Sequence, residues 1–111
     1  VIIFGNSPLT EISRKSVRPL TYALQQNYPN PFNPSTTISY EIPTTEKVTL
    51  KIYDVLGRTV ATLVDDVLQP GQYTAVWSGE NSAGIRVATG VYFYRLQAGS
   101  FTSVRKMLLV K

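Results

Sequence analysis

The chain has 111 residues with no cysteine and no histidine, which excludes disulfides, thiolate metal sites and catalytic triads built on a histidine base. Its net charge of +4 lies at the two ends. Residues 1–20 hold three basic side chains against one acidic, residues 103–111 hold three basic and no acidic, and the middle holds five against six. A nucleic-acid-binding protein more often has a basic patch interleaved with aromatic side chains over its body, so this distribution indicates no nucleic-acid partner.

Residues 1–20 are expected to lie outside the folded domain. Residues 1–4 are a short apolar run closed by Gly5 and Pro8, which suits the last strand of an upstream domain, and residues 9–20 are polar and aperiodic, as in a linker. The chain begins at Val1 with neither an initiator methionine nor a secretion signal, so we expect it to be a piece of a longer protein. The predicted organisation is a linker or the end of an upstream domain in residues 1–20 and one domain in residues 21–111. No apolar run approaches the ~20 residues that a membrane-spanning helix needs.

A proline-rich run, residues 27–38, leads into the first predicted strand. Pro29, Pro31 and Pro34 each fix their own φ and push the preceding residue out of the helical region. The segment is therefore predicted to be a stiff, extended or turning lead-in, neither a helix nor a central strand. We expect it to lay Tyr28 and Phe32 against the first part of a β domain.

From residue 36 onward the apolar side chains recur with a period of two, the pattern of strands with one buried face. The predicted strands are residues 36–42, 48–53, 58–65, 73–77, 91–98 and 101–110, with one short strand at 85–87 inside a long loop over 78–90. Gly57 is expected to adopt the positive φ that closes the turn after residue 53. The apolar positions of residues 58–65 do not share one parity, so a bulge is expected there.

Six or seven short strands at a spacing of about ten residues, without a convincing helix, are typical of a β-sandwich. We expect Trp77, Tyr92, Tyr94 and Leu96 to meet in its core. Antibody domains add a cysteine pair over the buried tryptophan, and this chain has none. The predicted fold is an all-β, Ig-like antiparallel β-sandwich of about seven strands without a disulfide.

No arrangement of residues in the sequence predicts catalysis. Most acidic side chains fall on turns or outward strand faces, and no glycine-rich phosphate loop ends in a lysine. Asp65 with Asp66, or Glu80 with Asn81, would suit a calcium ion by residue type. Neither pair belongs to the spaced ligand series of a calcium loop, so ordinary turn residues are favoured. We therefore expect no enzyme activity, no cofactor and no metal site.

The aromatic side chains admit two interpretations. Seven tyrosines and one tryptophan on a β-sandwich could form a platform on which sugars stack. Most of them, however, alternate in step with the aliphatic residues of their strand, which indicates core packing. Tyr53, Phe93 and Gln97 have the opposite parity and form the only plausible exposed set.

Five blocks of sequence stand out in order along the chain: residues 24–38, 48–58, 70–73 with Trp77, 90–96, and a basic ending with Lys106 and Lys111. Together they resemble the type A C-terminal sorting domain of the type IX secretion system, used by Bacteroidetes and related bacteria. The motif residues are Asn27, Tyr28, Pro29, Asn30, Pro31, Phe32, Asn33, Pro34, Gly57, Trp77, Gly90 and Tyr92. Ser78 departs from the family, which usually has an acid there, and this weakens a calcium site in that loop. The family is related in fold to the Ig-like domain of flagellar hook-capping proteins.

The resemblance implies a non-catalytic export signal. Such domains are recognised in the periplasm and pass through the outer membrane with the upstream cargo domain of the same chain. A sortase-like peptidase commonly removes them, and the cargo is released or joined to a surface anchor. The implied partners are the outer-membrane shuttle and translocon and this peptidase. The implied localisation is the periplasm in transit, then the cell surface or the medium.

The last predicted strand suggests how such recognition would work. An open terminal strand is a site for strand addition by a receptor, and Arg105, Lys106 and Lys111 are predicted to steer it toward an acidic receptor surface. Cleavage is predicted within residues 8–20, because peptidases need unpaired backbone. Two alternatives remain open. One is a carbohydrate-binding module attached to a secreted enzyme, which requires Tyr53, Phe93 or Trp77 on a flat exposed face, and the other is a structural spacer.

Overall fold

The computed structural model describes residues 20–111. The predicted upstream strand, the linker and nearly all of the predicted cleavage stretch lie outside the described residues. The division of the chain into residues 1–20 and 21–111 therefore stays a prediction.

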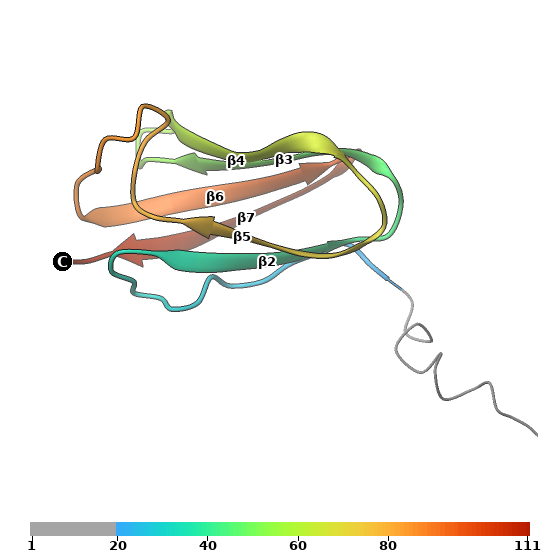
Figure 1. The fold of residues 1–111 in the computed structure, drawn as a ribbon, viewed down its shortest axis with the longest axis horizontal. Coiled ribbons are helices and arrows are strands. Elements are labelled where there is room, and N and C mark those ends of the chain that lie inside the picture. Colours follow the sequence, from blue (N-terminus) through green and yellow to red (C-terminus); the bar gives the residue numbers. More distant parts are fainter. Residues whose placement is uncertain (1–19) are drawn as a thin grey trace, which may run out of the picture.

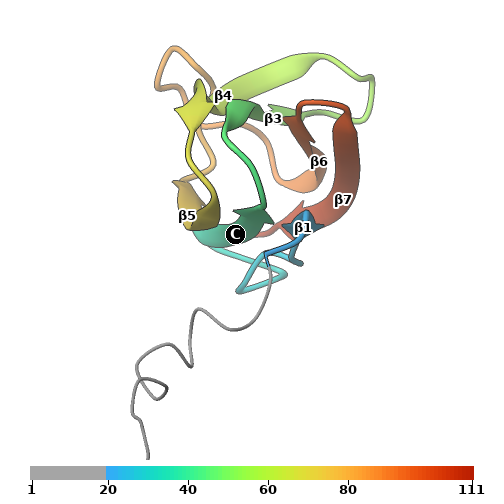
Figure 2. The ribbon, with the colours of Figure 1, turned by 90° about the vertical axis from the view of Figure 1, so that its right-hand side faces the viewer.

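Seven strands form two antiparallel sheets that pack face to face (Figure 1). The strands are β1 (Ala23–Leu24), β2 (Thr36–Ile42), β3 (Glu46–Tyr53), β4 (Thr59–Leu68), β5 (Gly71–Trp77), β6 (Gly90–Ala98) and β7 (Phe101–Leu109). One sheet has the order β1-β2-β5 and the other β4-β3-β6-β7. Figure 2 shows the sheets nearly end-on, enclosing the interior between them. Residues 20–111 contain no helix, so the predicted all-β sandwich without a disulfide is confirmed.

The core follows from the alternation in the sequence. Every second side chain of β2, β3 and β6 points between the sheets, as the period of two requires. The buried side chains on these strands include Ile38, Tyr40, Ile42, Val48, Leu50, Ile52, Tyr92, Tyr94 and Leu96. Complete burial of one aliphatic or aromatic side chain contributes about 1.5–3 kcal/mol, so this alternation supplies the main driving force for the fold.

The strand β4 differs from its prediction in length. It runs through Leu68, because Asp65 and Asp66 still pair with Thr49 and Val48 of β3. Two register shifts interrupt the β3–β4 ladder, one after Leu50, and they confirm the predicted bulge.

The predicted short strand at residues 85–87 is reduced to one isolated bridge between Glu80 and Arg86. The side chain of Asn81 explains the difference, because its Oδ1 accepts hydrogen bonds from the amides of Ala83 (2.9 Å) and Ile85 (3.0 Å). An asparagine that bonds its own following backbone favours a turn over a ladder.

The lead-in places its two aromatic side chains on opposite sides. Phe32 is buried between the sheets, as predicted, but the prediction for Tyr28 is wrong, since its side chain is 81% exposed. Tyr28 exchanges two backbone hydrogen bonds of 2.9 Å with Thr37, which lies on the outer parity of β2 between buried Thr36 and Ile38. Directly opposed residues of an antiparallel pair share a face, so this bridge turns the Tyr28 side chain outward.

Candidate functional site

One buried asparagine fixes the lead-in to the four-stranded sheet. The amide of Asn27 donates to the Tyr94 hydroxyl (2.8 Å), which in turn donates to the carbonyl of Gln25 (2.7 Å). The Asn27 side-chain amide also donates to Thr36 Oγ1 (2.9 Å) and to the carbonyl of Pro29 (3.1 Å). Burial raises the pKa of the Tyr94 hydroxyl, which keeps it protonated as a donor. The asparagine of the motif therefore has a structural role.

Phe32 of the lead-in packs with two other aromatic motif residues, Trp77 and Tyr92. The Phe32 and Trp77 ring centroids are 5.7 Å apart, and Tyr92 meets Trp77 edge-on at 5.2 Å. The indole Nε1 of Trp77 donates to the carbonyl of Glu80 (2.9 Å), and the Tyr92 hydroxyl donates to Ala88 (2.6 Å). Trp77 is buried in the core, so the flat exposed face that a sugar-binding module requires does not include it.

The lead-in also covers one end of the β7 edge. The amide of Phe32 donates to the carbonyl of Leu108, and the amide of Val110 donates to the carbonyl of Phe32, both at 3.0 Å. Asn30 Oδ1 accepts from the amide of Leu108 (3.0 Å), and Gln26 Nε2 donates to the carbonyl of Lys106 (2.9 Å). The expectation of an open last strand is therefore wrong from Lys106 to Val110, because segments far apart in sequence close that edge.

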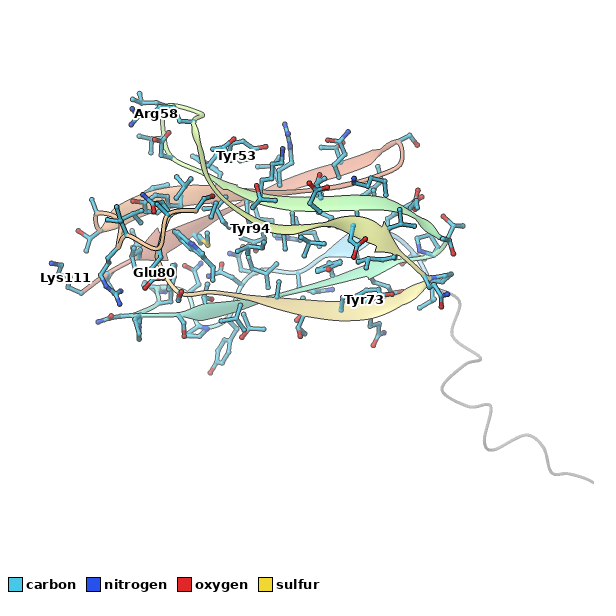
Figure 3. The ribbon with its side chains drawn as sticks, turned by 45° about the horizontal axis from the view of Figure 1, so that its top comes forward. Tyr53, Arg58, Tyr73, Glu80, Tyr94 and Lys111 are labelled. Carbon is cyan, nitrogen blue, oxygen red and sulfur yellow. The ribbon has the colours of Figure 1, made fainter. Side chains whose placement is uncertain are left out.

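The three basic residues singled out in the sequence lie in three different settings. Arg105 shares the parity of buried Met107 and Leu109, and its Nε donates to the carbonyl of Leu24 (2.6 Å), which links β7 to β1. Lys106 projects from the opposite face of the sheet. Lys111 follows β7 and lines a depression of about 280 Å³ with Pro34 and Arg86. Figure 3 shows Lys111 at the end of the sandwich, away from Tyr73 at the other end.

The hairpin between β3 and β4 is closed by an aspartate. Asp54 Oδ1 accepts from the amides of Leu56 (2.9 Å) and Arg58 (3.0 Å), and its Oδ2 accepts from Arg58 Nε (2.8 Å). These donors, the Arg58 amide first, hold the pKa of the Asp54 carboxyl below its usual range. Gly57 has the predicted positive φ, 81°, and this turn leaves the side chains of Val55 and Leu56 exposed.

The side chains of β3, β6 and β7 that point away from the core form a surface that we call the outer face. It consists of Lys47, Thr49, Lys51, Tyr53, Val91, Phe93, Arg95, Gln97, Thr102, Val104, Lys106 and Leu108. Lys51 lies directly opposite Arg95, and Phe93 lies between Tyr53 and Lys106. The Arg95 guanidinium sits 5.0 Å from the centroid of the Tyr53 ring.

Sequence reasoning identified Tyr53, Phe93 and Gln97 as the exposed set on this face but gave no role to Lys51 and Arg95. Lys51 alternates in step with Tyr53 on its strand, and Arg95 with Phe93 on its own. This alternation was the signal that could have identified them. Their direct opposition depends on the β3–β6 register, which periodicity does not give. A depression of about 300 Å³ is lined by Tyr53, Asp54, Val55, Gly57, Phe93, Arg95 and Val104.

Three of the four side chains weighed for calcium have other partners. Asp65 forms an ion pair with Lys47 (3.0 Å), Asp66 accepts from the amide of Val67 (2.8 Å), and Asn81 accepts from two amides of its own loop. Within residues 20–111 no group of three or more acidic side chains is placed to hold a metal ion. The same residues include no helix long and apolar enough to cross a membrane.

Comparison with known proteins gives a family match and a set of similar folds. The Ig-like domain of FlgD matches residues 32–100. The fold is similar to part of dimeric latent PorU from Porphyromonas gingivalis (TM-score 0.66, 21% identity, 84% of this chain and 10% of that chain). It is also similar to part of PorZ, described as an essential bacterial surface component of the type-IX secretion system of P. gingivalis (TM-score 0.53, 18% identity, 92% of this chain and 12% of that chain).

FlgD from P. aeruginosa shares the fold too (TM-score 0.52, 20% identity, 67% of this chain and 58% of that chain). This chain thus spans about a tenth of PorU and PorZ and somewhat more than half of FlgD. No curated protein matches the sequence. The matches agree with the resemblance to sorting domains related to the hook-capping Ig-like domain, and at these identities the solved structures establish the fold.

Proposed function

The chain belongs to the FlgD Ig-like domain family, and we propose that it serves as a non-catalytic sorting domain that directs an exported protein through the outer membrane by the type IX secretion system. The observation that carries the proposal is the fold shared with PorZ over 92% of this chain. The same sandwich occupies 12% of PorZ, which supports a role as a module attached to a larger exported protein. Function belongs to sites and not to folds, so an export experiment must decide.

The fold suits a module that travels with different cargo. Its core and lead-in are held by contacts within residues 20–111, such as the Asn27–Tyr94 hydrogen bond and the packing of Phe32 on Trp77. A domain stabilised by its own contacts needs none from the cargo. The cargo would precede it in the chain, and a sortase-like peptidase would cut within residues 8–20 and exchange the domain for a surface anchor. The protein would be periplasmic in transit and then surface-bound or secreted.

Recognition by the shuttle and translocon is assigned in this proposal to exposed cations near the end of the chain. Lys106 and Lys111 are exposed. Arg105 contributes by holding β7 against Leu24 as well as by its charge, because its Nε already donates to that carbonyl. Exposed charges on a docking surface mainly raise the rate of encounter with a partner of opposite charge.

A secretion assay tests the proposal. Residues 1–111 are fused behind a periplasm-targeted fluorescent protein and expressed in a bacterium with and without its type IX translocon. The reporter should reach the surface or the medium only in the competent strain. The host's own sorting domain in the same fusion is the control. Retention of the test reporter in the periplasm of both strains, while the control is exported, would reject the proposed function.

A further inference from the structure

The outer face carries three cations that lack acidic partners within residues 20–111. Lys51 and Arg95 lie directly opposite each other on β3 and β6, and Lys106 on β7 lies opposite Phe93, diagonally from Arg95. Like charges in direct opposition destabilise a sheet. The arrangement therefore lowers the stability of the isolated domain, which suggests that these charges interact with a partner.

The nearby acids do not offset these charges. Asp54 is held by Arg58 (2.8 Å), and Asp65, at the β4 side of this sheet, is held by Lys47 (3.0 Å). Glu46 accepts from the Tyr22 hydroxyl (2.5 Å) at another edge of the sandwich. In the described part of the chain, the outer face is thus a surface of net positive charge.

Apolar side chains lie between the cations. Tyr53, Phe93 and Val104 line the depression of about 300 Å³, and the Val104 side chain is 54% exposed. Val91 and Leu108 extend the apolar surface as an opposed pair at the end of the same strands. A connected apolar patch rimmed by charge is typical of a site for protein–protein interaction.

We propose that the outer face is the docking surface for a partner protein that presents carboxylates around an apolar side chain. The apolar side chain would enter the depression, and the carboxylates would pair with Lys51, Arg95 and Lys106. The aliphatic Val91, Val104 and Leu108 favour protein over sugar, since a sugar platform is built from open aromatic rings. Arg95 already lies over the Tyr53 ring.

The size of the surface indicates a transient complex. Three strands of about nine residues cover about 400 Å² at the usual strand spacing and rise. A stable complex buries about 800 Å² on each partner, so this face suits brief recognition. The inference rests on the proposed function to the extent that the partner is taken to be a component of the export machinery.

Charge reversal tests the proposal in the secretion assay. Arg95→Glu and Lys51→Glu each turn the opposed like charges into an ion pair, so the melting temperature should be unchanged or higher. Export should nevertheless fall about tenfold or more. Thr74→Glu, which adds an acid on the exposed side of β5 in the other sheet, is the control and should leave export unchanged. If Arg95→Glu and Lys51→Glu were exported as well as the control, the docking surface would be overturned. If the unmodified domain were not exported, the sorting function itself would be rejected.

Binding in solution tests the same surface without secretion. Residues 1–111, labelled with ¹⁵N, are titrated with an acidic peptide of alternating glutamate and leucine and with its lysine counterpart. The acidic peptide should shift the amides of Lys51, Phe93, Arg95, Val104 and Lys106, and Arg95→Glu should abolish the shifts. Shifts elsewhere, or none, would overturn the proposal. Tighter binding to polygalacturonate, or to phosphatidylglycerol vesicles, would overturn the choice of a protein partner.

Discussion

The amide of Asn27 and the hydroxyl of Tyr94 lie 2.8 Å apart in the buried interior. This hydrogen bond joins the first residue of the asparagine- and proline-rich motif to β6, a central strand of the four-stranded sheet. The same hydroxyl donates to the carbonyl of Gln25, so one side chain satisfies two backbone groups, at residues 25 and 27.

Tyr94→Phe should lower the free energy of unfolding by about 1–3 kcal/mol, because it leaves the Asn27 amide and the Gln25 carbonyl without a partner. Chemical denaturation followed by tryptophan fluorescence measures the change. Tyr53→Phe is the control, since no hydrogen bond of the Tyr53 hydroxyl is formed within residues 20–111. Equal effects of the two substitutions would contradict the assigned role of the Tyr94 hydroxyl.

Phe32→Ala should lower the free energy of unfolding by about 3–5 kcal/mol, the usual effect of removing a buried aromatic side chain. Tyr28→Ala should change stability by no more than about 0.5 kcal/mol, because that side chain is exposed. Both values come from urea unfolding at equal protein concentration. A large loss for Tyr28→Ala would mean that its ring packs against the domain after all.

Asp54→Asn should destabilise the protein at neutral pH and have less effect in acid. The folded pKa of Asp54 lies below the ordinary 3.8, so the stabilisation by its ionised form is complete above that value and is lost as the pH falls through the folded pKa. Unfolding free energies of the two proteins at pH 7 and near pH 3 give the comparison. A difference that stays constant with pH would show that the carboxylate charge does not matter.

Asn30→Ala should open the covered end of the β7 edge. Its Oδ1 accepts from the amide of Leu108, and without that acceptor the amide should exchange its hydrogen faster. Hydrogen exchange by NMR at Leu108 is the measurement. Asn33→Ala is the matched control, because no side-chain hydrogen bond of Asn33 is formed within residues 20–111. Unchanged protection of Leu108 in the Asn30 variant would show that the Asn30 side chain does not close this edge.

The parts of the fold that could be predicted are those encoded locally. The parity of Ile38 with Tyr40, or of Leu50 with Ile52, fixes which side of a strand faces the core, and glycine at position 57 fixes a turn. These signals were sufficient for the all-β sandwich and for six of its seven strands, whereas β1, only two residues long, was not predicted.

The surfaces depend on which distant residues become neighbours, and that information is not local. The outward direction of Tyr28 follows from its pairing with Thr37, and the positive surface follows from Lys51 meeting Arg95 across two strands. The closure of the last strand likewise requires Asn30 and Phe32 to reach Leu108. Periodicity assigns faces to residues but does not assign partners.

The course of residues 22–32 along β7 has a mechanical consequence. Contacts join Tyr22 to Phe101, Leu24 to Arg105, Gln26 to Lys106 and Phe32 to Leu109, so the two segments run in the same direction. Figure 1 shows the blue start of the described chain at one end of the sandwich and the C-terminus at the other. Tension applied to the two ends of the domain would therefore load these contacts together in shear instead of peeling them one at a time. A domain pulled by the adjoining part of its chain should resist unfolding until several of these contacts break at once.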